Sequence, residues 1–127
     1  MRRFVWAAAL FVAATTARAE GSLTVGNVTA APGEKKSGVI AVAAGADAGT
    51  SIPITLVNGA KPGPVLALFA GTHGYEYTSI VALPRVLAKL EPGKMKGAVI
   101  LVHMVSPVTF YGRMIYRGPD GKNQNRM

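Results

Sequence analysis

The chain has 127 residues, enough for one small domain at most, and it contains no cysteine, which excludes disulfides and a lipid-modified cysteine. Its formal net charge is +8, but after the first 19 residues Lys35-Lys36 is the one adjacent basic pair. There is no basic helix and no basic stretch interleaved with aromatic residues, so we expect no nucleic-acid partner. The positive charge is compatible with a small anionic substrate.

Residues 1–19 have the composition of a secretory signal peptide. Met1-Arg2-Arg3 is a charged start, residues 4–14 are almost wholly apolar, and Ala17-Arg18-Ala19 is a small-x-small cleavage site. The apolar core is about a dozen residues, too short to span a bilayer as a helix. The main rival is an uncleaved N-terminal anchor. We therefore expect an exported bacterial protein, periplasmic or secreted, with no stable membrane span after cleavage.

Residues 20–64 are predicted to form a β-rich lead-in cut by turns. Strands are expected over 22–28, 38–43 and 52–57, and a loop rich in glycine and proline follows at 58–64. Pro53 lies inside the third of these stretches, which suggests an edge strand or the start of a strand.

The pattern of the sequence changes from residue 65 onward. Residues 65–70 form an apolar run without alternation, typical of a central strand covered on both faces. A helical period covers 76–90, where Pro84 predicts a kink or a helix that starts late. A second buried strand is expected over 97–105, and the order strand, helix, strand predicts a parallel pair with a right-handed crossover. Residues 106–127 read as loop.

One βαβ unit buries little area, so a chain of this composition is at the limit of what folds alone. More than 20 residues follow the last expected strand and build no obvious element. We therefore expect the chain to be the N-terminal piece of a longer protein.

His73 and Glu76 are the candidate metal ligands, in the stretch "AGTHGYE" directly after the apolar run. Ligand crevices of open α/β sheets form at the carboxyl ends of strands. Imidazole and carboxylate groups both bind zinc, and Gly71 and Gly74 permit a tight backbone between strand and helix. The alternative is a loop histidine followed by an acidic residue that favours the start of a helix.

The segment "GPVLALFAGTHGYEYTSI" resembles the zinc-binding segment of the succinylglutamate desuccinylase/aspartoacylase family, which is related to the zinc carboxypeptidases. The resemblance continues through "MKGAVILVHMVSPVTF" and "RGPDGKNQNR", and it reaches back over "PGEKKSGVIAV" and "IPITLVNGAKPGP". It implies an α/β fold: the N-terminal part of a zinc-carboxypeptidase-like three-layer fold with a mixed, mainly parallel central sheet, preceded by the β-rich lead-in. By this resemblance, residues 65–127 are expected to be a truncated zinc-hydrolase catalytic domain.

The resemblance also implies roles for single residues. His73 and Glu76 match two zinc ligands, and Asn125 and Arg126 match an Asn-Arg pair that grips the carboxylate of the substrate. Arg117 stands where the family often has an arginine that holds substrate or polarises the scissile carbonyl. The alternatives are a turn-forming asparagine and exposed surface arginines.

Three features depart from the family pattern. Tyr75 stands where Asp or Asn is usual, and Ser106-Pro107 stands where Asn-Pro is usual, which bears on substrate specificity. The third zinc ligand, a histidine, and the catalytic glutamate of the family are expected beyond residue 127. His103 lies on the second expected strand, where we expect a packed histidine and not a ligand.

The resemblance implies a Zn²⁺-dependent hydrolase of an amide or ester bond, with a small acyl-amino-acid, ester or peptide as its anionic substrate. The 127-residue chain alone is expected to be inactive. Two alternatives remain open: an exported metallocarboxypeptidase that acts on peptides, and an exported binding module without catalytic activity.

Overall fold

The structure is a computed structural model that describes residues 18–19, 21–118 and 120–126. The predicted signal peptide lies almost entirely outside the described residues and stays a prediction. The elements, in chain order, are β1 (Arg18–Ala19), β2 (Leu23–Val25), β3 (Val28–Ala30), β4 (Lys35–Val42), β5 (Thr50–Asn58), β6 (Lys61–Phe69), α1 (Tyr77–Lys89), a 3₁₀ turn (Pro92–Lys94), β7 (Lys96–Val102), α2 (Pro107–Tyr111) and a second 3₁₀ turn (Gln124–Arg126).

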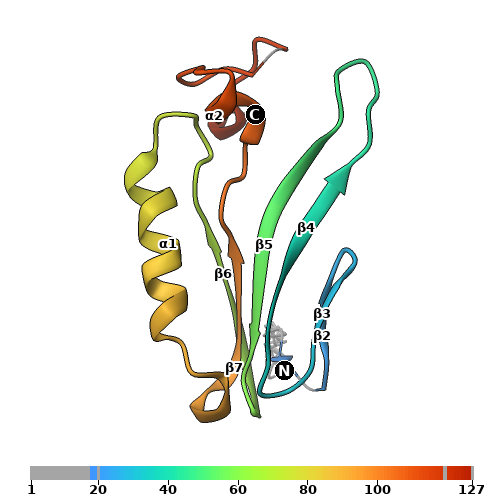
Figure 1. The fold of residues 1–127 in the computed structure, drawn as a ribbon, viewed down its shortest axis with the longest axis vertical. Coiled ribbons are helices and arrows are strands. Elements are labelled where there is room, and N and C mark those ends of the chain that lie inside the picture. Colours follow the sequence, from blue (N-terminus) through green and yellow to red (C-terminus); the bar gives the residue numbers. More distant parts are fainter. Residues whose placement is uncertain (1–17, 20, 119, 127) are drawn as a thin grey trace, which may run out of the picture.

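A mixed five-stranded sheet in the order β1-β6-β7-β5-β4 forms the centre of the described chain (Figure 1). Strands β6 and β7 pair in parallel on either side of α1 in the sequence, which confirms the predicted βαβ unit. The expected α/β class with a mixed sheet is therefore confirmed. Within the described residues the other three pairings are antiparallel, so the expectation of a mainly parallel sheet does not hold for this part of the chain.

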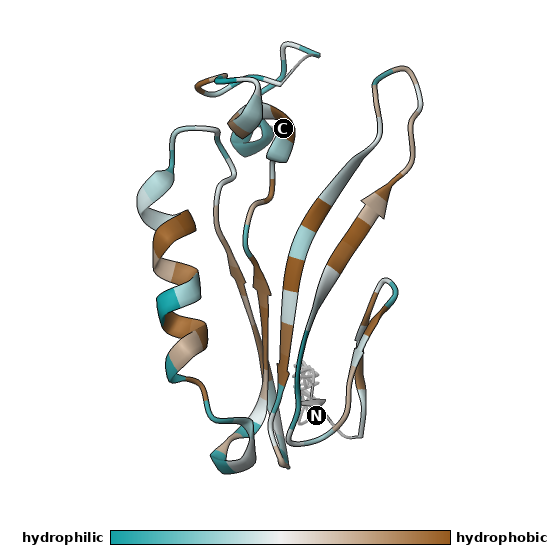
Figure 2. Cartoon of the chain, viewed as in Figure 1, coloured by the Kyte–Doolittle hydropathy of each residue, from teal (hydrophilic) through white to brown (hydrophobic). Residues whose placement is uncertain are grey.

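Two apolar clusters lie on opposite faces of the sheet. On one face, Leu83 of α1 packs with Val57, Val99 and Leu101 of the strands. On the other face, Val28 and Ala30 of the small β2–β3 hairpin pack with the apolar side chains of β5 and β7 that point away from α1. Figure 2 shows the apolar bands that run along β5, β7 and α1. Burial of these side chains from water is the main force that holds the layers together.

The first predicted strand, over 22–28, is wrong, because the chain reverses within it. Gly26 has a φ of +59°, and β2 and β3 pair across it with Val25 opposite Val28. Gly26 and Asn27 thus form a two-residue hairpin turn, and this kind of turn favours glycine in its left-handed positions. The predicted strands over 38–43 and 52–57 are confirmed as parts of β4 and β5.

Pro53 is the fourth residue of β5, an interior strand between β4 and β7, so the expected edge strand and the expected strand start are both wrong. The carbonyl of Pro53 accepts a hydrogen bond from the backbone N–H of His103, 2.9 Å away, just beyond the last β5–β7 pair, Ile54 and Val102. The N and C=O of one strand residue point to the same side of the strand. The missing N–H of Pro53 therefore faces the end of β7, where the ladder has finished.

Strand β6 is more exposed than the predicted central strand. Its residues beyond Pro64 pair only with β7 among the described strands, and Leu66 and Phe69 are 55% and 63% exposed. From sequence alone, the apolar run of β6 predicts a strand that is buried on both faces. In the described residues, however, α1 packs on β6 around Leu68, while Leu66 on the same face and Phe69 on the opposite face are exposed.

Helix α1 contains Pro84 in its interior, at the eighth of 13 residues. A helix that starts late enough to place Pro84 in its first turn is therefore wrong. Among the described residues, no helix is long and apolar enough to cross a membrane. Residues 106–127 were expected to be loop, but Pro107 begins the short helix α2, since its fixed φ suits the first helical position.

Candidate metal centre

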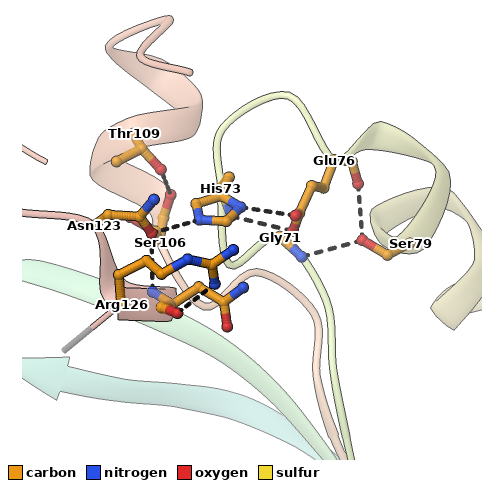
Figure 3. Close-up of polar contacts among 9 residues, drawn as sticks. Gly71, His73, Glu76, Ser79, Ser106, Thr109, Asn123 and Arg126 are labelled. Atoms are coloured by element: carbon orange, nitrogen blue, oxygen red, sulfur yellow. Dashed lines mark hydrogen bonds and ion pairs between the residues drawn. The ribbon is translucent and has the colours of Figure 1, made fainter. Parts of the chain in front are cut away.

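The candidate site lies where the parallel strands β6 and β7 end. Gly71 has a φ of +63°, and its backbone N–H donates to Ser79 Oγ of α1 at 3.2 Å. The loop after β7 is bonded to this turn, because the backbone N–H of Ser106 donates to the Gly71 carbonyl at 3.0 Å. The loops that leave the two strands are therefore fixed to each other and to the first turn of α1 (Figure 3).

His73 and Glu76 point toward each other across this turn (Figure 3). The Nδ1 atom of His73 is 2.8 Å from Oε1 of Glu76, and Oε2 of Glu76 accepts the backbone N–H of His73 at 3.2 Å. The side chain of His73 is 8% exposed, whereas that of Glu76 is 45% exposed. The structure therefore brings the two predicted ligands together, with Glu76 at the surface and His73 beneath it.

The other edge of the His73 ring contacts the C-terminal loop. Its Nε2 atom is 2.9 Å from Oδ1 of Asn123, and the Tyr116 ring packs edge-on with centroids 5.2 Å apart. Asn123 was not among the site residues predicted from the sequence. Its position two residues before Asn125 is the one sequence signal that points to it.

These contacts set the charge of the pair. Hydrogen bonds from His73 to Asn123 and to Glu76 raise the pKa of His73, while burial and the charge of Arg126 act against the rise. The hydrogen bond from His73 holds the pKa of Glu76 below its ordinary value. Both shifts favour the charged forms, and the two side chains form an ion pair whenever His73 is protonated.

Asn125 and Arg126 lie beside this pair in the turn Gln124–Arg126. The backbone N–H of Asn125 donates to Oδ1 of Asn123 at 3.0 Å, and Nη1 of Arg126 donates to the Asn125 carbonyl at 2.8 Å. Arg126 is close enough for its charge to lower the pKa of His73. The predicted Asn-Arg pair is therefore next to the predicted metal ligands.

Arg117 and His103 make their described side-chain hydrogen bonds elsewhere. The guanidinium of Arg117 donates to the Gly121 carbonyl at 3.1 Å, within its own loop. His103 follows β7, and its Nε2 atom is 2.8 Å from Oγ1 of Thr55. Burial lowers the pKa of His103. No described hydrogen bond connects either residue to His73 or Glu76.

The donor set of the pair suits zinc, which binds imidazole nitrogen and carboxylate oxygen. The Nδ1 and Oε1 atoms already converge, and a divalent cation can replace the proton that they share. Among the described residues, no group of three or more His, Asp or Glu side chains gathers around one point. The described residues thus offer two candidate metal ligands at this site.

A cavity of about 350 Å³ lies behind the C-terminal loop. Its wall includes Thr72, next to His73, and Gln124, next to Asn125. Val42 and Ile52 line it from the β4–β5 hairpin. The volume is within the range of small-molecule pockets.

Residues 62–127 match the profile of the succinylglutamate desuccinylase/aspartoacylase catalytic domain, which is more than half of the chain. The chain belongs to this family. The match includes His73, Glu76, Asn125 and Arg126. The family resemblance inferred from the sequence motifs is therefore confirmed.

Known proteins resemble the chain in sequence and in structure. An N-alpha-acetyl-L-2,4-diaminobutyric acid deacetylase from Halomonas elongata is 38% identical over 76 residues, which are 59% of this chain and 22% of that protein. The crystal structure of a succinylglutamate desuccinylase/aspartoacylase from Rhodobacter sphaeroides superposes with a TM-score of 0.62 at 27% identity, over 72% of this chain and 29% of that one.

Two further solved structures extend the likeness. An aspartoacylase family protein from Mesorhizobium loti gives a TM-score of 0.68 at 25% identity, over 85% of this chain and 34% of that one. The product-bound ectoine utilization protein EutE (DoeB) from Ruegeria pomeroyi gives 0.60 at 28% identity, over 72% and 29%. The chain spans about a third or less of the length of each of these relatives.

Proposed function

We propose that this chain supplies part of the active site of a zinc-dependent deacylase, which hydrolyses an amide or ester bond of a small carboxylate-bearing substrate. The observation that carries the proposal is the convergence of His73 Nδ1 and Glu76 Oε1, 2.8 Å apart, at the carboxyl ends of β6 and β7. The position of this pair within the matched family domain supports it.

His73 and Glu76 would hold the metal in this proposal. Zinc, when bound, polarises a carbonyl group and lowers the pKa of water toward neutrality. Glu76 is bonded through Oε2 to the backbone of His73, which keeps its Oε1 aimed at the imidazole. The chain itself would thus contribute a ligand pair whose orientation is fixed before any metal arrives.

Asn125 and Arg126 would anchor the carboxylate of the substrate. A guanidinium binds a carboxylate through two parallel hydrogen bonds and keeps its charge at any physiological pH. The Arg126 side chain is exposed and makes one described hydrogen bond, to the adjacent Asn125 carbonyl. Arg117 would stabilise the negative charge that develops on the carbonyl oxygen, after its guanidinium leaves the Gly121 carbonyl.

The substrate class follows from the relatives. One relative is a deacetylase of an N-acetylated diamino acid, and others are aspartoacylases or desuccinylases. We propose an acylated amino acid as substrate for the protein to which this chain contributes. Its free carboxylate would meet Arg126, and its acyl carbonyl would lie at the His73–Glu76 pair.

The test is hydrolysis by a polypeptide that contains this chain and spans the full length of its relatives. A panel of N-acyl amino acids, esters, and peptides with free or blocked C-termini would be assayed before and after removal of zinc. We expect zinc-dependent cleavage of N-acyl amino acids, and at least a 100-fold loss of kcat/KM in His73→Ala. Full activity in that variant, or in the metal-free protein, would refute the proposal.

The same panel separates the deacylase from its alternatives. Cleavage confined to peptides with free C-termini would assign a metallocarboxypeptidase, and no cleavage of any substrate would favour a binding module. For the 127-residue chain alone, we expect weak zinc binding and no measurable turnover, because its described residues place no third His, Asp or Glu beside the two proposed ligands to act as general base. Turnover by the chain alone would contradict this expectation.

A further inference from the structure

Asn123 is the residue outside the predicted site whose contacts reach both parts of it. Its Oδ1 atom is 2.9 Å from Nε2 of His73 and 3.0 Å from the backbone N of Asn125. We propose that Asn123 is a positioning residue, which presents Nδ1 of His73 to the metal and ties that ligand to the Asn125–Arg126 anchor. This inference rests on the proposed function.

The orientation of the Asn123 amide follows from its backbone partner. A backbone N–H can only donate, so the Asn123 atom that faces Asn125 N is the oxygen. The same oxygen faces Nε2 of His73, and that nitrogen must therefore carry a hydrogen and donate it. In a neutral imidazole with hydrogen on Nε2, the lone pair is on Nδ1, which is the atom that faces Glu76 Oε1.

This arrangement selects one ring nitrogen for the metal. Nδ1 and Oε1 share the space between His73 and Glu76, while Nε2 is occupied by its bond to Asn123. Histidine ligands in metal sites commonly donate their second ring N–H to an outer acceptor, which fixes the tautomer and the ring plane. Asn123 performs this task with a neutral amide oxygen.

The link to the substrate anchor is equally direct. The side-chain oxygen of Asn123 accepts the backbone N–H of Asn125, and its backbone carbonyl accepts the N–H of Arg126 at 2.9 Å. An asparagine that bonds the backbone two residues ahead stabilises a turn. The backbone N–H groups of both anchor residues therefore donate to Asn123. A displacement of His73 on metal binding would be transmitted to Arg126 through Asn123.

The test uses ring ¹⁵N NMR of the 127-residue chain, which has only two histidines, during a titration with Zn²⁺ in the absence of any affinity tag. In the unsubstituted chain, we expect zinc to shift the Nδ1 signal of His73, with Nε2 still protonated. In Asn123→Leu, which keeps the size but not the acceptor, zinc should bind about 10- to 100-fold more weakly and at both ring nitrogens. Asn123→Asp, which keeps the acceptor, should restore binding at Nδ1.

Gln124→Leu is the matched control, since Gln124 is an exposed neighbour in the same loop with no described side-chain hydrogen bond to His73. It should bind zinc as the unsubstituted chain does. Zinc at Nδ1 with unchanged affinity in Asn123→Leu would overturn the inference and leave the proposed function standing. The absence of any zinc effect on His73 in the unsubstituted chain would overturn the proposed function itself.

Discussion

Gly74 lies where the loop between His73 and Glu76 passes closest to the α2 region. A Cβ atom at this position would collide with the backbone carbonyl oxygens of Thr109 and Met114. Backbone atoms cannot rotate away as side chains do, so Gly74→Ala must push the loop off α2. We expect a loss of about 1–3 kcal/mol in the free energy of unfolding, measured by urea denaturation.

Gly93→Ala is the control for this prediction, because a Cβ atom at Gly93 has no heavy atom within 4 Å. It should change the free energy of unfolding by less than about 0.5 kcal/mol. If both variants were equally stable, the close packing of the His73 loop against α2 would be wrong.

The His73–Glu76 pair gives the metal-free chain a characteristic pH dependence. The raised pKa of His73 means that its stabilisation is complete below the ordinary value of 6.5 and is lost as the pH rises through the raised value. The lowered pKa of Glu76 means that its stabilisation is present above 4.5 and is lost as the pH falls through the lowered value. The pair therefore contributes most between these two ordinary values.

His73→Gln removes the titration, so we expect it to cost more unfolding free energy at about pH 5.5 than at about pH 9. His103→Gln should show the opposite trend, because burial lowers the pKa of His103 and its protonation disfavours the folded state. Urea denaturation at the two pH values measures both. A cost for His73→Gln that is the same at both values would show that the pair does not form.

Pro84 lowers the stability of helix α1. It is exposed, and a residue with an N–H at this position would donate to the carbonyl of Ile80, one turn earlier. Pro84→Ala should restore that bond and remove the steric conflict of the ring with the preceding turn. We expect the free energy of unfolding to rise by about 1–3 kcal/mol, a range set by the cost of proline in a helix interior and by the greater freedom of the unfolded variant.

Arg85→Ala is the matched control, at the next exposed position of the same helix. It should leave stability within about 0.5 kcal/mol of the unsubstituted chain. A loss of stability in Pro84→Ala would mean that α1 needs the proline in order to pack on the sheet.

Most elements could be predicted from the spacing of apolar residues, because each buried face of the sheet requires apolar side chains at regular positions. Long apolar runs marked β6 and β7, and the spacing of leucines marked α1. The β2–β3 hairpin was missed although Gly26-Asn27 is a two-residue turn signal, because each flanking strand has only three residues and the whole stretch resembles one continuous strand. The exposure of β6 was not predicted, because an apolar strand sequence indicates burial on both faces. It does not show which elements bury the strand, and the described residues leave Leu66 and Phe69 exposed.

In the fold as a whole, the convergence of His73 and Glu76 was predictable because both lie in the loop after β6, three residues apart. The proximity of Asn125 and Arg126 came from the family resemblance and not from pattern. Asn123 could not be predicted from spacing, since 50 residues separate it from His73 and only the fold brings them together. The loop that carries Arg117 has its own internal bond, which no local signal indicated.

The proposed function requires that His73 and Glu76 form a metal site at the shared end of β6 and β7. Calorimetric titration of the 127-residue chain with Zn²⁺ tests it most directly, with His73→Ala, Glu76→Gln and His103→Ala as the three variants. We predict one weak site that strengthens as the pH rises, because zinc displaces a proton. That site should be lost in the first two variants and unchanged in His103→Ala. Zinc binding that survives His73→Ala, or that disappears in His103→Ala, would contradict the claim.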